Sequence, residues 1–277
     1  MSIITVTPPP RRLGRAVAHT GVLARRNLLG SVRRADVLLL STIQPITFML
    51  MFLYVFGGAI EQALPSAAAG SYVNWLIPGI LAQSAVFGAT PTAFGLNHDR
   101  TTGVIDRFRS LPMARSAVLA GRTLADLLRS TFILLLQLGV GVLLGFRWQT
   151  NLLGLVAAVG LALAFGYACS WVTATIGLAV KSPEAIQAAV YMVVFPLTLL
   201  SSVFLPTQTM PGWLQAFADH QPVTVIANAL RSLTLGEGGL SPGQNVAGQT
   251  LLALAWTAGI MVVFAPLAVR VYRRSTS

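Results

Sequence analysis

Few side chains in this sequence have the type and spacing that chemistry requires. A nucleotide-binding Walker A loop needs Gly-Lys-Ser/Thr, whereas the only lysine, Lys181, stands in AVKSP. The three histidines, His19, His98 and His220, are far apart in sequence and leave a histidine metal site unsupported. The single cysteine, Cys169, allows neither an internal disulfide nor a cysteine-based metal site. We therefore expect a chain that is not an enzyme and holds no cofactor or metal of its own.

The acidic residues leave one main candidate for proton chemistry within an apolar segment. Asp126 has Arg122 four residues before it and Arg129 three residues after it, so all three share one face of a helix. An acid at membrane depth would suggest a proton relay. The two flanking arginines favour a structural ion pair over a transport acid.

The composition indicates an integral membrane protein of the all-α class. The 277 residues are 55% hydrophobic and 10% charged, with a mean hydropathy of +0.72. Soluble domains carry roughly 25% charged residues, so this chain has too few to cover a globular surface. The net charge of +11 flanks the apolar runs, which indicates topogenic arginines and not a nucleic-acid partner.

Six apolar stretches are long enough to cross a bilayer, which takes about 20 residues. We expect six transmembrane helices, in a membrane domain over residues 36–277, at approximately Val37–Gly58, Tyr72–Leu96, Leu119–Leu144, Leu152–Val180, Ala185–Leu205 and Val246–Val269.

The basic residues predict the orientation of these helices. Fifteen arginines and lysines fall in the two terminal segments and in the second and fourth loops, against two, Arg147 and Arg231, in the loops on the other side. Because positive residues concentrate on the cytoplasmic side, both termini are expected in the cytoplasm and the membrane is expected to be the plasma membrane.

Residues 1–35 predict a basic arm with an amphipathic helix. Its basic face holds His19 and four arginines, Arg12, Arg15, Arg26 and Arg33, opposite Leu13, Val17, Ala24 and Leu28. Such a helix lies in the inner membrane interface and contacts lipid phosphates or a cytoplasmic partner. Topogenic charge on a plain helix would explain the number of arginines but not their segregation. The stretch MSIITVTPPPRRLGRA has no apolar core, so no cleavable signal peptide is expected.

Small residues recur every four positions in the fourth stretch: Ala158, Ala162, Gly166, Ser170 and Ala174. Gly141 and Gly145 repeat the pattern more weakly in the third. Small residues let helices approach closely in membranes. The face is either a subunit interface or a packing surface within one chain, and the second reading is favoured.

The cytoplasmic segment 97–118 has the character of a docking element for another protein. It mixes both signs of charge with apolar residues at helical spacing, and Pro112 breaks this helical pattern. A solvated loop would explain the charged residues but would not explain the apolar side chains of Ile105 and Phe108. The residues expected to dock are Gly103, Ile105, Asp106, Arg107, Phe108, Arg109, Leu111 and Pro112.

Residues 206–240 begin with a turn at Pro206 and contain two apolar segments that are too short to cross a bilayer. Pro211 and Pro222 are placed to open helices, where a missing N–H costs nothing. Trp213 and Phe217 share one face of the first segment. Ile226, Leu230 and Leu233 line the second.

Together these features resemble the type-2 ATP-binding-cassette (ABC) exporter permeases, particularly the daunorubicin-resistance branch of drug and lipid exporters. The likeness covers about residues 13–272. It rests on the basic arm, the six spans, the segment DRTTGVIDRFRSLPMARSAVLAGR and above all on the block Ser182–Arg231.

The resemblance implies a permease subunit that moves an amphipathic drug or complex lipid. Its partners would be separate cytoplasmic ATPase subunits, which hold ATP and Mg²⁺, a second permease copy or paralogue, and membrane lipid. It also implies that residues 206–240 form a re-entrant hairpin that closes the outer end of the path. The expected outer gate is Pro206, Pro211, Trp213, Phe217 and Pro222, and the polar candidates along the path are Gln44, Gln83, Ser84, Gln187, Ser201 and Ser202.

Two alternatives remain open at this point. An export permease for polysaccharide or glycolipid is the nearest, although the spans show no evident aromatic ladder for sugar stacking. An ion-coupled secondary transporter or channel would require a mid-membrane ionisable site or broken helices in two repeated halves. The sequence shows neither a clear repeat nor a convincing acid.

Overall fold

A computed structural model describes residues 35–61, 71–102, 115–180, 182–240 and 244–274, and every element within these ranges is helical. The basic arm with Arg12, Arg15, Arg26 and Arg33 lies outside the described residues. So does the docking stretch from Gly103 to Pro112, and both therefore stay predictions.

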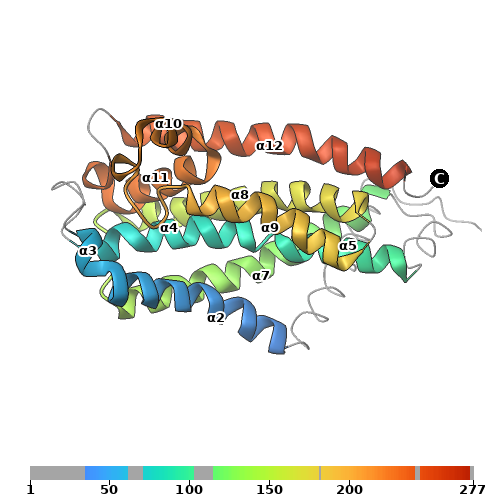
Figure 1. Cartoon of the computed structure of the whole chain (residues 1–277), viewed down its shortest axis with the longest axis horizontal. Coiled ribbons are helices and arrows are strands. Elements are labelled where there is room, and N and C mark those ends of the chain that lie inside the picture. Colours follow the sequence, from blue (N-terminus) through green and yellow to red (C-terminus); the bar gives the residue numbers. More distant parts are fainter. Residues whose placement is uncertain (1–34, 62–70, 103–114, 181, 241–243, 275–277) are drawn as a thin grey trace, which may run out of the picture.

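Long helices run side by side along the molecule (Figure 1). Short helices α10 and α11 lie together at one end, which we call the hairpin end, and α5 lies at the other. In chain order the helices of four or more residues are α2 (Ala35–Met51), the π-helical turn Phe52–Phe56, α3 (Gly57–Glu61), α4 (Tyr72–Phe87), α5 (Thr90–Thr101), α7 (Arg115–Leu143), α8 (Leu152–Ala179), α9 (Pro183–Leu199), α10 (Gly212–His220), α11 (Pro222–Leu235), a 3₁₀ turn at Gly236–Gly239, and α12 (Val246–Arg274).

Four helical runs among the described residues are long and apolar enough to cross a membrane: Thr42–Glu61, Asp126–Leu143, Leu152–Ala179 and Val246–Tyr272. They coincide with the first, third, fourth and sixth predicted stretches. The fifth stretch forms α9, a shorter apolar helix of 17 residues that ends at Leu199 rather than Leu205.

The second stretch is not the continuous helix that its length predicts. It divides into α4 and α5 at Gly88–Ala89, where the Gly88 N–H closes the last turn of α4 on Ser84 O. Pro91, which lacks an N–H, lies in the first turn of α5. The carbonyl of Ala89, which accepts from Thr92 N–H at 3.1 Å, also accepts a hydrogen bond of 2.7 Å from Thr173 Oγ1 of α8. The break is therefore held by a neighbouring helix.

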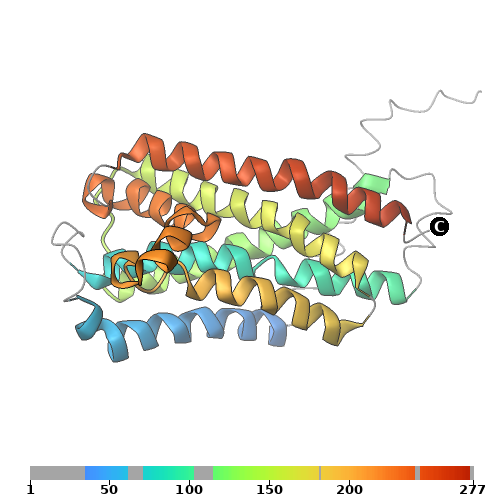
Figure 2. The same cartoon turned by 45° about the horizontal axis from the view of Figure 1, so that its top comes forward.

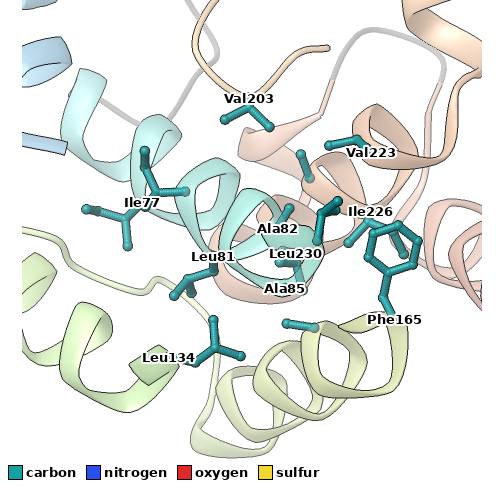
Figure 3. Close-up of a cluster of buried hydrophobic side chains, with 14 of the residues drawn as sticks. Ile77, Leu81, Ala82, Ala85, Leu134, Phe165, Val203, Val223, Ile226 and Leu230 are labelled. Carbon is teal, nitrogen blue, oxygen red and sulfur yellow. The ribbon is translucent and has the colours of Figure 1, made fainter. Parts of the chain in front are cut away.

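Helix α4 forms the centre of the bundle and packs against α7, α8 and α11. Figure 3 shows its Ile77, Leu81, Ala82 and Ala85 facing side chains from these helices, among them Leu134 of α7. All residues from Asn74 to Val86 are buried. In the view of Figure 2, α12 and α2 lie at opposite edges of the bundle, which leaves much of each exposed.

The small-residue face of α8 packs within the chain, as favoured above. Ala158, Ala162, Gly166, Ser170 and Ala174 are all buried, and a Cβ added at Gly166 would lie 3.0 Å from Ala85 O of α4. Close approach of the two backbones is what small residues permit.

The weaker repeat in α7 divides into two roles. Gly141 packs against the Ile77 side chain, whereas Gly145 has φ +104° just beyond the end of the helix and has open space where a Cβ would be. The expectation that Gly145 belongs to a packing face is therefore wrong, because Gly145 supplies a turn that other residues rarely adopt.

The contact at Gly166 leads to a stability prediction. We expect Gly166→Leu to lower the free energy of unfolding by about 2 kcal/mol, because overpacking forces α4 and α8 apart. Gly160→Leu on the same helix is the control, since nothing lies within 4 Å of its Cβ position. Thermal unfolding in detergent measures both variants, and an equal loss in the two would show that Leu disturbs α8 by some route other than the α4 contact.

Helix α5 is fastened to the C-terminal end of α8 by several contacts. A side chain at Gly177 would overlap Ala93 O. Arg100 Nη1 donates to Leu178 O at 2.9 Å, and Asn97 Nδ2 donates to Val180 O at 3.1 Å. A cation and an amide thus satisfy carbonyls that a helix end leaves free. Because of these contacts, we expect α5 and this end of α8 to move together.

Candidate functional site

A cavity of about 120 Å³ lies near the middle of the bundle, where α2, α4, α5, α7 and α9 meet. We call it the midbundle cavity. Its walls combine aromatic and aliphatic side chains with polar ones. The lining residues are Gln44, Pro45, Phe48, Gln83, Ser84, Phe87, Gly88, Thr90, Pro91, Arg129, Ile133 and Tyr191. Three of the six predicted path residues, Gln44, Gln83 and Ser84, therefore come together here.

Three oxygen atoms of this lining lack a hydrogen-bond partner: Gln83 Oε1, Ser84 Oγ and Thr90 Oγ1. Each atom is buried, and a buried polar group without a partner costs about 1–3 kcal/mol. Such groups are rare in folded proteins, and those that persist call for a functional explanation.

The charged residues beside the cavity serve helix packing. Asp126 of α7 accepts a hydrogen bond from Thr92 Oγ1 of α5. Arg129 Nη2 donates to Gly88 O at 3.1 Å, at the break between α4 and α5. Both residues are buried. These contacts fit the predicted structural role of Asp126, while the side chain of its other predicted partner, Arg122, lies outside the part of the chain for which the structure describes side chains.

A second cavity, of about 580 Å³, lies at the hairpin end. We call it the hairpin-end cavity. Its lining is largely polar and is drawn from α4, the segment after α9, the hairpin and α12: Trp75, Ser202, Pro206, Thr207, Gln208, Gln215, Asp219, His220, Asn228, Arg231, Gly239, Leu240, Gln244, Gln249 and Leu252. Pro206, one of the predicted gate residues, is buried in this wall.

Residues on one face of α4 line both cavities. Trp75 lines the hairpin-end cavity, and Gln83 and Phe87 line the midbundle cavity. Between them stands Gly79, where an added Cβ would overlap Val203 O and would lie 3.0 Å from Arg231 Nη2. These residues recur every four positions and so follow one face of the helix. The contact at Gly79 therefore lies between the two cavities along α4.

Arg231 of α11 is the centre of this contact. Its guanidinium lies 3.6 Å from the centre of the Trp75 ring, and Nε donates to Trp75 O at 3.0 Å. Nη1 donates to Ser202 Oγ and Asn228 Oδ1, each at 2.9 Å. Nη2 donates to Ser202 O at 2.6 Å and to Val203 O at 3.4 Å. All five N–H groups of the side chain thus have neutral acceptors, on α4, on α11 and on the segment after α9.

The charge pattern places Arg231 among the basic residues of the outer loops and says nothing of its environment; in the structure Arg231 lies in α11 with its side chain only 1% exposed. A signal for burial is present in the sequence. Ala227, Arg231 and Leu235 follow one another at four-residue spacing, and both apolar neighbours are buried. An arginine on the apolar face of an amphipathic helix has to find acceptors inside the protein.

The other predicted path residues lie away from the midbundle cavity. Gln187 of α9 is exposed. The Ser201 hydroxyl donates to Thr198 O and accepts from Val203 N–H, at the end of α9. The Ser202 hydroxyl accepts from Arg231 and donates to Asn228. Ser202 therefore belongs to the Arg231 contact and to the hairpin-end cavity.

The two short helices begin where their prolines predict. Pro211 is the N-cap of α10 and Pro222 is the first residue of α11. In α11, Ile226 and Leu230 are fully buried and Leu233 is partly buried. In α10, Trp213 is 77% exposed and Phe217 is 48% exposed. Helix α10 therefore presents two aromatic rings outward.

The long apolar helices of the bundle define an integral membrane protein. The bundle encloses one mainly apolar cavity, the midbundle cavity, and one largely polar cavity at the hairpin end. The described residues hold no group of three or more His, Cys, Asp and Glu side chains that could bind a metal ion. Apolar cavities with a few placed polar groups are typical of small-molecule sites.

Comparison with known proteins identifies the family. Residues 18–235 match the model of the ABC-2 type transporter family, so the chain belongs to that family. It is 37% identical over 235 residues to the daunorubicin resistance ABC transporter permease protein DrrB1 of Streptomyces coeruleorubidus, covering 85% of this chain and 79% of that protein. It is 30% identical over 261 residues to a probable doxorubicin resistance ABC transporter permease protein, DrrC, of Mycobacterium tuberculosis, covering 94% and 90%. A putative transport permease, ycf38, of Cyanophora paradoxa is 27% identical over 222 residues, covering 76% and 72%.

Proposed function

We propose that this chain is the permease subunit of an ATP-driven exporter that moves an amphipathic drug or a complex lipid out across the plasma membrane. Family membership supports the transporter class, and the names of the daunorubicin and doxorubicin resistance relatives support a drug-like substrate. The observation that carries the proposal is the pair of cavities on one face of α4, with the Arg231 contact between them.

In this proposal the chain crosses the membrane six times, with both termini in the cytoplasm and the hairpin end outside. Four crossings are the long apolar helices. The other two are α9, whose 17 residues span about 26 Å, and the pair α4–α5, which runs along the bundle in one direction (Figure 1). The length of α9 approaches the hydrocarbon thickness of about 30 Å, and the pair α4–α5, with 16 and 12 residues, is long enough to exceed it.

The hairpin of α10 and α11, within residues 206–240, is the re-entrant outer element. Helix α10 has nine residues, a length of about 14 Å that cannot cross a bilayer. Trp213 and Phe217 face outward and suit the headgroup region, where aromatic rings are favoured. Helix α11 lies deeper and places Arg231 against α4. We assign the outer gate to the Arg231 contact together with Pro206, Pro211, Trp213, Phe217 and Pro222.

The driving energy in this proposal comes from separate cytoplasmic ATPase subunits that bind ATP and Mg²⁺. A second permease copy or a paralogue completes the path, and the basic arm contacts lipid. The docking segment 97–118 includes the end of α5, which is fastened to α8 through Asn97 and Arg100. Movement of the ATPase would thus reach the bundle through α5.

A reconstitution experiment tests the proposed function. The tagged chain, expressed in its native host, is expected to co-purify with an ABC ATPase. The complex in sealed vesicles is expected to move doxorubicin only with ATP and Mg²⁺, measured by the fluorescence of the drug. The control is the same complex with the Walker A lysine of the ATPase replaced.

The alternatives predict different results in that experiment. A secondary transporter would move its substrate under an ion gradient without any ATPase. A polysaccharide or glycolipid permease would co-purify with an ATPase but would leave doxorubicin in place. Transport without an ATPase would overturn the exporter class, and doxorubicin left in place would overturn the assignment to a drug.

A further inference from the structure

The unpartnered atoms of the midbundle cavity indicate what kind of chemical group it binds. Gln83 and Ser84 are each 7% exposed and therefore more than nine-tenths buried. Their Oε1 and Oγ atoms, with Thr90 Oγ1, have no hydrogen-bond partner, and all three residues line the same cavity. An amide oxygen accepts hydrogen bonds, and each hydroxyl can accept one as well as donate one. The cavity thus offers three acceptors within one small space.

We propose that the midbundle cavity binds a hydroxyl- or amine-bearing ring of the exported amphiphile, with Gln83, Ser84 and Thr90 accepting its hydrogen bonds. This inference rests on the proposed function and specifies the chemistry of its substrate.

The walls of the cavity suit a ring. Phe48, Phe87 and Tyr191 line it, and the rings of Phe87 and Tyr191 meet edge to face with centroids 6.2 Å apart. A volume of about 120 Å³ is close to the roughly 150 Å³ that accommodates benzene, and is below the 300 Å³ or more of typical drug sites. The cavity therefore takes one ring, and the rest of the amphiphile extends past the rim, where Gln44 and Tyr191 are exposed.

The charges beside the cavity favour a neutral or weakly basic group over an anion. Arg129 lines the cavity, but its Nη2 is engaged by Gly88 O. The carboxylate of Asp126, also buried, stands one helical turn away. The two formal charges are opposite in sign, so the net charge beside the cavity is close to zero and gives an anion little advantage over a neutral group.

Isosteric substitutions of the full-length chain test the proposal. The variants are Gln83→Leu, Ser84→Ala and Thr90→Val, which remove the unpartnered atoms and keep the shape of the cavity. The control is Gln137→Leu in α7: both polar atoms of this fully buried amide also lack partners, but the residue does not line the cavity. Binding is measured by fluorescence titration in nanodiscs. The probes are doxorubicin, an aromatic ring system with hydroxyl and amine groups, and pyrene, an aromatic compound with neither.

Each cavity variant is expected to weaken doxorubicin binding about fivefold or more, as the loss of one buried hydrogen bond implies. Pyrene binding and the unfolding temperature should not fall, because the three oxygens that are removed have no hydrogen-bond partner in the unliganded protein. Gln137→Leu should bind doxorubicin as the wild type does. Unchanged doxorubicin binding in the three variants, an equal loss of both probes, or a fall in unfolding temperature would overturn the proposal.

The binding measurements and the transport measurements test different claims, so this inference can fail while the proposed function stands. Variants that bind doxorubicin normally in a complex that still exports it with ATP would remove only the role of the three acceptors. A wild-type complex that exports nothing would remove the export function, whatever the titrations show.

Discussion

Replacing Arg231 by methionine should lower the unfolding temperature by roughly 6–12 °C and abolish transport. The change leaves Trp75 O, Ser202 O and Asn228 Oδ1 without their shared donor. Hydrogen bonds to a charged group contribute about 1.5–3 kcal/mol each, so a total loss of about 3 kcal/mol or more is expected, at about 2–4 °C per kcal/mol. Cys169, the single cysteine, is buried and reports unfolding through a thiol-reactive fluorescent dye.

Two further variants control for charge and position. Arg147→Met removes the other basic side chain of the hairpin end that the sequence places in an outer loop. Because Arg147 is exposed, it should unfold as the wild type does. Arg231→Lys should not restore stability, since an ammonium group cannot reach acceptors on α4 and on the segment after α9 at once. An unfolding temperature unchanged in Arg231→Met would show that the contact contributes nothing to the closed bundle.

The role of Arg231 in the outer gate can be tested separately from its role in stability, by measuring how fast a cysteine inside the bundle is labelled. Asn228→Ala removes one acceptor of Arg231 and leaves the other four bonds. In this background a cysteine at position 83, with Cys169→Ser, should react with a membrane-impermeant maleimide applied from the hairpin side. The same cysteine beside an intact Asn228 should react slowly. Equal labelling rates with and without Asn228→Ala would show that the Arg231 contact does not form the outer gate.

The second large effect is expected at the docking segment. Phe108→Ala should leave membrane insertion intact, weaken ATPase association more than tenfold and abolish export. Loss of a buried aromatic anchor costs about 2 kcal/mol or more at an interface, and about 1.4 kcal/mol is tenfold in affinity. The measurements are co-purification of the ATPase and ATP-dependent doxorubicin transport.

A charge reversal and a matched rescue make this prediction specific. Arg107→Glu with Arg109→Glu should also uncouple the subunits, and opposite changes on the ATPase surface should restore association. Normal transport by Phe108→Ala, with full ATPase stimulation, would move the coupling contact to another part of the chain, most simply to the basic N-terminal arm.

Much of the fold could be predicted because its signals are local. Apolar stretches of fixed length gave the four long helices, and four-residue spacing gave the small face of α8. Pro211 and Pro222 gave the starts of α10 and α11, because proline suits the first turn of a helix. The break at Gly88–Ala89 had a local signal as well, in Gly88 and Pro91, but the length of the apolar stretch outweighed it.

The site could be predicted only in part because its geometry depends on distant segments. Gln44, Gln83 and Ser84 were recognisable as polar residues in apolar helices, and the cavity that unites them requires α7 and α9 as well. The burial of Arg231 depends on Trp75, 156 residues away in sequence. No local sequence pattern predicts that the backbone carbonyl and the indole ring of a distant residue will interact with this guanidinium.

The attachment of α5 to α8 has a consequence for biosynthesis. The residues of α5 emerge from the ribosome about 80 residues before the partners at the end of α8 that bind them, as the separations of 78 and 83 residues show. At a synthesis rate of about 5–20 residues per second, the interval is roughly 4–16 s. During that time Asn97 and Arg100 have no helix end to bind, and α5 is too polar to settle in lipid by itself. In a nascent chain stalled before Leu152, α5 would therefore be complete but without its partner helix, and it would be accessible to the insertion and quality-control machinery. Only after α8 is complete can α5 and α8 pack against each other.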